Sequence, residues 1–214
     1  MDKKYELIES DIKGLYRVKA LKDFGDVKKG DIGGCVENPN NLSHKGYCWV
    51  YGDAKICDEA RIYGNAQVMD YAVIQGNARI YGNAQVMDCA VIDGNAQIHG
   101  DSEVWGYAII RDNALIYGDS VINGNAFIGG YTEIKTGCHI GCIEEKFKNV
   151  LYVQCKASLI TVYTDMNNVI KCNIGCQKRI TLEGLLKRIE KDGGMTKDKE
   201  ECVRIMQNAH LLLG

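Results

Sequence analysis

Histidine and acidic side chains are the residues of this sequence best suited to acid–base chemistry. The chain has four histidines, His44, His99, His139 and His210. His99 stands two residues before Asp101, and a histidine within hydrogen-bond reach of a substrate can take its proton as a general base. His99 is therefore the candidate catalytic base, and His139 is the second candidate. The alternative for His99 is a structural role, because neighbouring repeats of the chain hold Tyr at the same position.

Cysteine and histidine cluster twice towards the C-terminus, and such clusters can bind zinc. Residues 138–142 read Cys-His-Ile-Gly-Cys and residues 172–176 read Cys-Asn-Ile-Gly-Cys, which offers five potential ligands. Three residues separate the cysteines, whereas two do so in common zinc sites. We favour buried thiols and predict no metal, but whether this group binds one stays open. Its cysteines are Cys138, Cys142, Cys172 and Cys176.

An internal repeat must position these side chains. Residues 61–78 and 79–96 are identical at all but two positions. Within this 18-residue unit runs a six-residue pattern, [IV]-x-[GD]-x-[AS]-x, whose aliphatic position recurs sixteen times from Val50 to Ile140. A period of six does not keep apolar residues on one face of a helix, whereas alternation within each hexad is typical of a strand.

The hexads predict short strands joined by tight corners. Inward residues at positions 1 and 5 fit one strand, and Gly followed by Asn or Asp at positions 3 and 4 fits one bend. Three hexads close one triangular coil, so residues 18 apart become neighbours in a parallel ladder. Sixteen hexads give about five coils.

This spacing resembles that of the hexapeptide-repeat family, and the resemblance covers residues 50–140. It implies a mainly β protein built on a left-handed parallel β-helix, with the hand taken from the family. Many members are acyltransferases that use a histidine base and bind acyl-CoA between neighbouring subunits. The resemblance thus implies acetyl-CoA or another acyl-CoA as cofactor for a transferase with His99 as its base, although the coils lack the insertion that often forms the acceptor pocket. For a protein without catalysis we predict no cofactor.

Outward positions 18 residues apart form columns, and one of the three predicted faces is apolar. Its columns are Met69, Met87 and Trp105; Tyr71, Cys89 and Tyr107; and Val73, Val91, Ile109 and Phe127. A contiguous exposed apolar surface usually meets another protein surface. We therefore predict the interface of a homotrimer, with docking of a terminal segment and an apolar ligand groove as alternatives.

The second face carries a column of rings, and the third is polar. The ring column consists of Tyr63, Tyr81, His99 and Tyr117. Stacked rings stabilise each other by about 1 kcal/mol or less per pair, which favours a structural ladder. The polar face is assigned the column Arg79, Gln97 and Leu115 together with Arg111.

The same rings could instead bind a planar ligand. Tyr63, Tyr81 and Tyr117 would stack on a base, and nearby guanidinium groups would meet phosphates. The candidates for the latter role are Arg61, Arg79 and Arg111.

Both ends of an open β-helix need caps because they expose strand edges. Residues 1–47 are predicted to form an N-terminal β-hairpin cap, and residues 48–145 the repeat domain. Residues 146–214 are predicted to form an α+β appendage, with strands at 151–155, 159–163 and 169–172, a helix capped by Thr181, and a final helix after Thr196. Caps at both ends disfavour an end-to-end polymer.

The whole arrangement resembles a group of hexapeptide-repeat proteins common in bacteriophages and prophages. Members are described as transferases or polymer-forming proteins, which names a fold more than an activity. The resemblance rests on residues 20–34, 41–46, 49–54 and 160–183.

Composition and charge exclude several classes of function. The chain has 214 residues, 46% hydrophobic, and a net charge of -2, which is typical of globular proteins. No apolar stretch approaches the roughly 18 residues of a membrane span, and the first residues lack the core of a signal peptide. We therefore expect a cytoplasmic protein without a membrane partner, whose scattered cysteines are reduced.

The charge differs between the two parts of the chain. Residues 146–214 hold 12 basic and 7 acidic residues, which leaves 14 and 21 for residues 1–145. The acidic repeat opposes binding of long nucleic acid, whereas the basic segment offers a surface for an acidic protein partner. Its exposed charges are predicted to include Lys178, Arg179, Lys187 and Arg188.

These observations favour a non-catalytic binding or scaffold protein of phage type. It would hold a small molecule or a signalling nucleotide in clefts at subunit boundaries. The alternative is an acyl-CoA-dependent acyltransferase. The sequence contains no phosphate-binding loop, paired-carboxylate site or nucleophile elbow.

Overall fold

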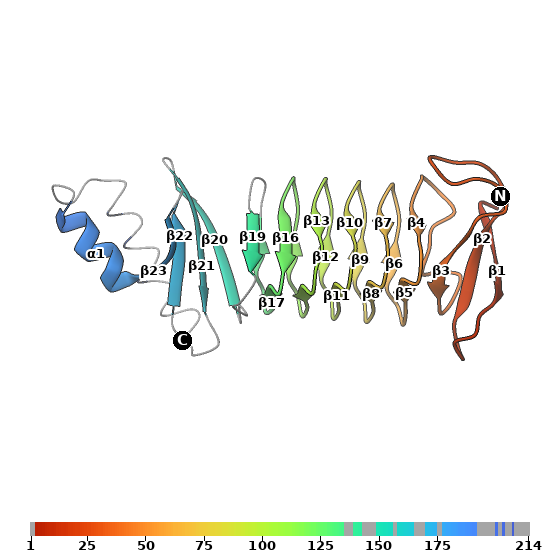
Figure 1. The fold of residues 1–214 in the computed structure, drawn as a ribbon, viewed down its shortest axis with the longest axis horizontal. Helices are drawn as coiled ribbons and strands as arrows, with labels where there is room; N and C mark the ends of the chain where they lie inside the picture. The colour runs from red at the N-terminus through yellow and green to blue at the C-terminus, as the bar shows by residue number, and fades with distance from the viewer. Residues whose placement is uncertain are drawn as a thin grey trace.

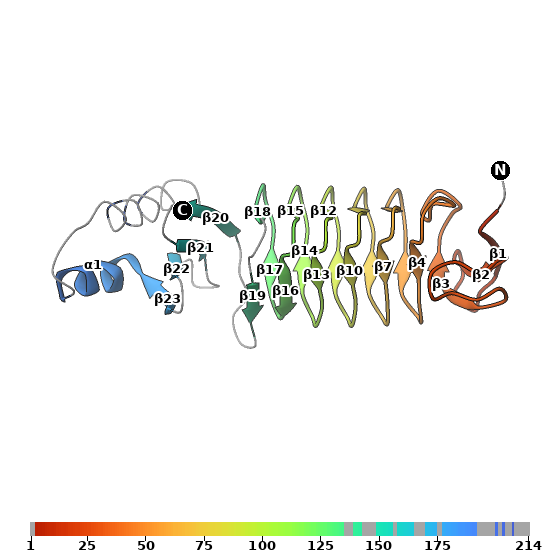
Figure 2. The same cartoon turned by 90° about the horizontal axis from the view of Figure 1, so that it is seen from above.

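Short strands stacked in coils form the middle of the molecule (Figures 1 and 2). The computed structural model describes residues 3–134, 139–142, 149–155, 158–164, 170–174 and 177–191, together with 200, 203 and 207. A hairpin lies at the N-terminal end of the stack, and a small sheet with a helix follows at the other end.

Three parallel sheets form the sides of the coils. The first contains β3 (Ile32–Val36), β5 (Lys55–Ile56), β8 (Val73–Ile74), β11 (Val91–Ile92), β14 (Ile109–Ile110) and β17 (Phe127–Ile128). The second contains β4 (Trp49–Val50), β7 (Gln67–Val68), β10 (Gln85–Val86), β13 (Glu103–Val104), β16 (Val121–Gly124) and β19 (His139–Cys142). The third contains β6 (Arg61–Ile62), β9 (Arg79–Ile80), β12 (Gln97–Ile98), β15 (Leu115–Ile116) and β18 (Glu133–Ile134).

The register between coils follows the 18-residue period. Ile74 lies opposite Ile92, and Ile92 lies opposite Ile110. The predicted fold class is therefore confirmed: a mainly β protein whose centre is a parallel β-solenoid with 18-residue turns.

The solenoid has about six turns, one more than the hexad count predicts. The additional turn comes from β3, which pairs in parallel with β5 although no hexad marks it. Val36 lies opposite Ile56, at an offset of 20 rather than 18 residues, so the six-residue pattern is broken at this point.

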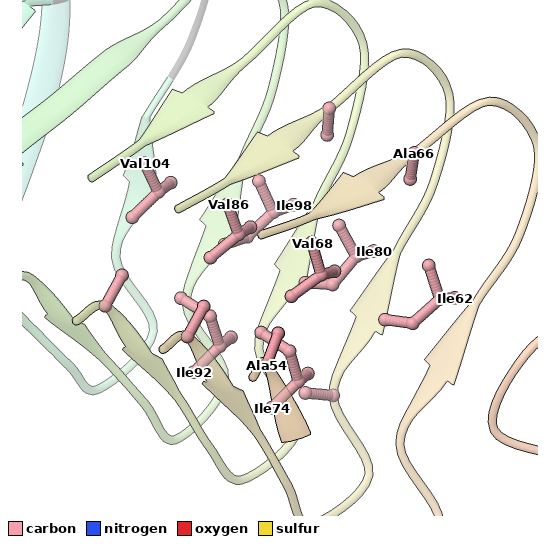
Figure 3. Close-up of a cluster of buried hydrophobic side chains, with 14 of the residues drawn as sticks. Ala54, Ile62, Ala66, Val68, Ile74, Ile80, Val86, Ile92, Ile98 and Val104 are labelled. Carbon is pink, nitrogen blue, oxygen red and sulfur yellow. The ribbon is translucent and has the colours of Figure 1, made fainter. Parts of the chain in front are cut away.

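Aliphatic position 1 and small position 5 of the hexads fill the interior. Ile62, Ile80 and Ile98 point into the same space as Val68 and Val86 (Figure 3), and all five are at most 1% exposed. Each fully buried side chain of this kind contributes about 1.5–3 kcal/mol. The hydrophobic effect therefore holds the coils together along the whole stack.

The corners use left-handed backbone, which suits glycine. Gly82 and Gly100 have φ values of 72° and 78°. Asp70 and Asp88 adopt the same conformation at another corner, where the Asp88 Oδ2 atom accepts a hydrogen bond from the Gly106 N–H at 3.0 Å. An aspartate at a corner thus links its own coil to the next one.

The N-terminal cap contains the hairpin expected from the sequence. Strands β1 (Tyr5–Glu9) and β2 (Tyr16–Ala20) pair antiparallel, and β2 pairs antiparallel with β3. The Arg17 guanidinium donates to the carbonyls of Gly33 and Gly52 at 3.1 and 2.9 Å and pairs with Asp53 at 2.7 Å. These contacts join the cap to the first coil.

The C-terminal segment forms an antiparallel sheet followed by a helix. The sheet contains β20 (Asn149–Cys155), β21 (Ser158–Thr164), β22 (Ile170–Ile174) and β23 (Gln177–Thr181), and the helix is α1 (Leu182–Lys191). Three strands and the helix were predicted, and β23 was not. The Thr181 hydroxyl accepts the Gly184 N–H at 3.1 Å, which confirms the predicted cap. The expected final helix falls largely outside the described residues.

None of the helices in the described ranges is long and apolar enough to cross a membrane.

Candidate functional site

Four rings stack along one side of the solenoid. Tyr63 and Tyr81 lie 4.8 Å apart between ring centroids, Tyr81 and His99 4.5 Å, and His99 and Tyr117 5.3 Å, with interplanar angles of 10° or less. Each ring follows a strand of the third sheet, so the coil spacing sets the stack. The predicted ring column is thereby confirmed as a geometric feature, which we call the ring ladder.

His99 is an inner member of the ring ladder. Tyr81 and Tyr117 cover its two faces, and burial lowers its pKa below the ordinary value, which favours the neutral ring. Asp101 does not pair with His99; its Oδ1 atom accepts a hydrogen bond from the Asn83 amide at 2.8 Å. This arrangement fits a structural ring better than a base oriented by a carboxylate, and the catalytic role of His99 stays a prediction.

Arg61 and Arg79 lie beside the ring ladder. They occupy the first positions of β6 and β9 and lie opposite each other across one coil step. Assigning Arg79 to a separate polar face was wrong, because each strand spans a hexad boundary and position 6 of one hexad shares a sheet with position 1 of the next. Both arginines are exposed, and neither forms an ion pair with any residue in the described ranges.

A surface hollow of about 350 Å³ opens where these arginines meet the first ring. Its lining consists of Asn40, Ser43, Arg61, Ile62, Tyr63 and Arg79. Burial and, to a smaller extent, the Tyr81 hydroxyl raise the pKa of Tyr63, while the two guanidinium charges oppose this shift. The hollow therefore combines an aromatic ring with two positive charges that have no acidic partner among the described residues.

Of the six lining residues, the sequence predicts Arg61, Tyr63 and Arg79 as ligand-binding and Ile62 as a core residue. It does not indicate Asn40 and Ser43. Both precede the first regular hexad, in the loop that leads from the cap into the coils. The signal that could have found Ser43 is the pair Leu42-Ser43, which matches Ile62-Tyr63 at an offset of 20 residues.

Of the other predicted ligand-binding residues, Tyr81 stacks on Tyr63 without lining the hollow, and Tyr117 and Arg111 lie away from it. Tyr117 is at the opposite end of the ring ladder, where its hydroxyl donates to the Glu133 carboxylate at 2.7 Å. Arg111 follows β14 in a different sheet and lies over the Phe127 ring at 4.5 Å, with Asp112 3.7 Å away. The structure thus brings Arg61, Arg79 and Tyr63 together and leaves Arg111 apart.

The predicted apolar face is divided between two sheets. Met69, Met87 and Trp105 follow strands of the second sheet, whereas the other aliphatic column lies within strands of the first. That column consists of Val73, Val91, Ile109 and Phe127. Tyr71 and Tyr107, 65% and 67% exposed, project from the corner between the sheets. The apolar residues therefore flank one edge of the solenoid, and their role as an interface stays a prediction.

The remaining candidates are only partly described. The side chains of His139, Cys138, Cys142, Cys172 and Cys176 lie outside the described residues, as do those of Lys178 and Arg179. Within the described part of the chain, no group of three or more potential ligands could hold a metal ion.

The cysteines of the described ranges whose side chains are placed are free thiols, as expected for reduced cysteines. Cys35 and Cys48 are free and buried, and Cys57 and Cys89 are free and partly buried. On α1, Lys187 pairs with Glu183 at 2.6 Å, and Arg188 is exposed.

Comparison with protein-family models and with curated proteins gave no match.

Proposed function

We propose that this protein is a non-catalytic binding protein that holds a small anionic ligand with a planar group in the hollow beside Tyr63. The observation that carries this proposal is the pair Arg61 and Arg79, which stand one coil apart next to a stacked ring without an acidic partner in the described ranges.

Charge and size both support this proposal. Like charges opposite each other on adjacent strands are destabilising, and an anion between the two guanidinium groups would relieve this repulsion through charge-assisted hydrogen bonds. A volume of about 350 Å³ lies within the range of small-molecule sites, roughly 300–1,000 Å³.

The acyltransferase remains the alternative proposal, with less support from the geometry. A general base needs a ring nitrogen within hydrogen-bond reach of its substrate. His99 lies within the ring ladder, two coils from Tyr63. A base at His99 would therefore act at a place other than the hollow.

Replacing both arginines tests the binding proposal. Arg61→Gln combined with Arg79→Gln should weaken binding of adenosine monophosphate at low salt at least about tenfold, because a hydrogen bond to a charged group contributes about 1.5–3 kcal/mol. Isothermal titration calorimetry measures the change. Arg111→Gln is the matched control and should bind as the wild type does. Equal binding by the double variant, or none by the wild type, would contradict the proposal.

We also propose, from the resemblance and the apolar columns, that the protein is a homotrimer of the phage-type group. Val91 and Ile109 are half-buried neighbours in β11 and β14, so lysines there would place charge within the proposed contact. Val91→Lys with Ile109→Lys should therefore yield a monomer in light scattering. Gln97→Lys, on another sheet, should leave the assembly intact, and an unchanged mass of the first variant would disprove this interface.

A further inference from the structure

The ring ladder has a first position that contains no ring. The Tyr63 N–H donates to the Ile80 carbonyl, and the Ser43 N–H donates in the same way to the Ile62 carbonyl. Leu42 lies opposite Ile62 in parallel pairing, as Ile62 does opposite Ile80. Ser43 is therefore the equivalent of Tyr63 one coil earlier, with a small side chain in place of a ring.

The hollow lies at this position. Ser43 and Tyr63 both line it, and Tyr63 stacks on Tyr81. In the described part of the chain Tyr63 has no second ring partner. A planar ring at the level of Ser43 would lie over the free face of the Tyr63 ring. It would continue the ring ladder at the spacing that the coils impose, about 4.8 Å.

The arginines stand at a defined distance from this position. Arg61 and Tyr63 are two residues apart along an extended segment, which separates their Cα atoms by roughly 6.6 Å. A ligand that engages both must carry its anionic group about one sugar unit away from its ring. Asn40 and the Ser43 hydroxyl add polar groups to the wall, although the Ser43 Oγ atom already accepts the Lys45 N–H at 3.0 Å.

We infer that the ligand belongs to the class of nucleoside monophosphates, whose base stacks on Tyr63 as an additional ring of the ladder while the phosphate lies against Arg61 and Arg79. This inference rests on the proposed function and narrows it to a ligand class and a binding pose. Base stacking on an aromatic side chain tolerates different bases, so the site recognises ring plus phosphate rather than one base.

Filling the vacant position tests the pose. Ser43→Tyr supplies the missing ring, since the next two coils carry Tyr63 and Tyr81 at this position. The variant should bind adenosine monophosphate at least about tenfold more weakly. Its binding of inorganic phosphate should not change. Ser43→Ala is the matched control: it loses the same hydroxyl contact to Lys45 but leaves the position vacant, and should keep its affinity. Thermal melting of both variants reports that the coils remain folded.

Titrating the two parts of the ligand separately distinguishes the outcomes. Adenosine and inorganic phosphate should each bind the wild type more weakly than adenosine monophosphate, because each engages half of the site. If Ser43→Tyr binds adenosine monophosphate like the wild type while the arginine variant does not, the stacked pose is overturned and the proposed function stands. If the wild type binds none of the three probes, both are overturned.

Discussion

Gly100→Ala is expected to lower the free energy of unfolding by about 2 to 5 kcal/mol. Gly100 has a φ of 78°, a conformation that costs a residue with a Cβ atom roughly 1–2 kcal/mol. A Cβ at this position would also lie 2.7 Å from the Gly118 carbonyl oxygen and 2.8 Å from the Gly118 nitrogen. Because these are backbone atoms of the next coil, relief requires the two coils to move apart.

Gly14→Ala separates the cost of the left-handed backbone conformation from the cost of the close contact between coils. Gly14 has a similar φ of 86°, but a Cβ there would meet nothing within 4 Å. Urea denaturation should therefore show a loss of about 1–2 kcal/mol for this variant, clearly smaller than that for Gly100→Ala. Equal losses would mean that close approach between the coils contributes nothing.

Trp49→Ala is expected to cost about 3–5 kcal/mol of stability. Trp49 is 1% exposed and meets the cap residues Tyr5 and Phe24 edge-on, at centroid distances of 6.3 and 5.3 Å. Its β4 strand pairs in parallel with β7. Truncation would leave a cavity between the cap and the solenoid.

The second tryptophan provides the control. Trp105 is 36% exposed, so Trp105→Ala should cost far less in the same denaturation experiment. A loss for Trp49→Ala as small as that for Trp105→Ala would show that the cap does not depend on this side chain.

The solenoid could be predicted because its periodicity is geometric. Every inward aliphatic residue from Ile56 to Ile128 meets the residue 18 positions away, and this identity of environments is visible in the sequence. The strand boundaries were harder to predict from the sequence. The six-residue pattern places a boundary between Arg79 and Ile80, whereas these two residues form one strand. This one-residue error in the boundary assigned Arg79, a candidate for ligand binding, to the polar face instead of the face of the ring ladder.

The hollow could be predicted only in part. Tyr63 and Arg61 belong to the repeat, and their stacking and exposure follow from its period. Ser43 belongs to the first coil, where paired residues such as Leu42 and Ile62 are 20 positions apart. An alignment with a period of 18 residues therefore does not find it. The strand β23 escaped for a different reason: residues 177–181 contain a single aliphatic side chain, Ile180, and lack the apolar alternation that indicates a strand.

Because residues 61–78 and 79–96 are nearly identical, the solenoid can gain or lose one complete 18-residue coil at a time. Removing residues 79–96 would bring β12 next to β6 in unchanged register, since Gln97 would follow Ala78 as Arg79 now does. Duplicating one would add a coil at about 4.8 Å without altering either cap. Recombination between such segments can thus lengthen or shorten the body of the protein, and with it the number of stacked rings, while both ends keep their own sequence.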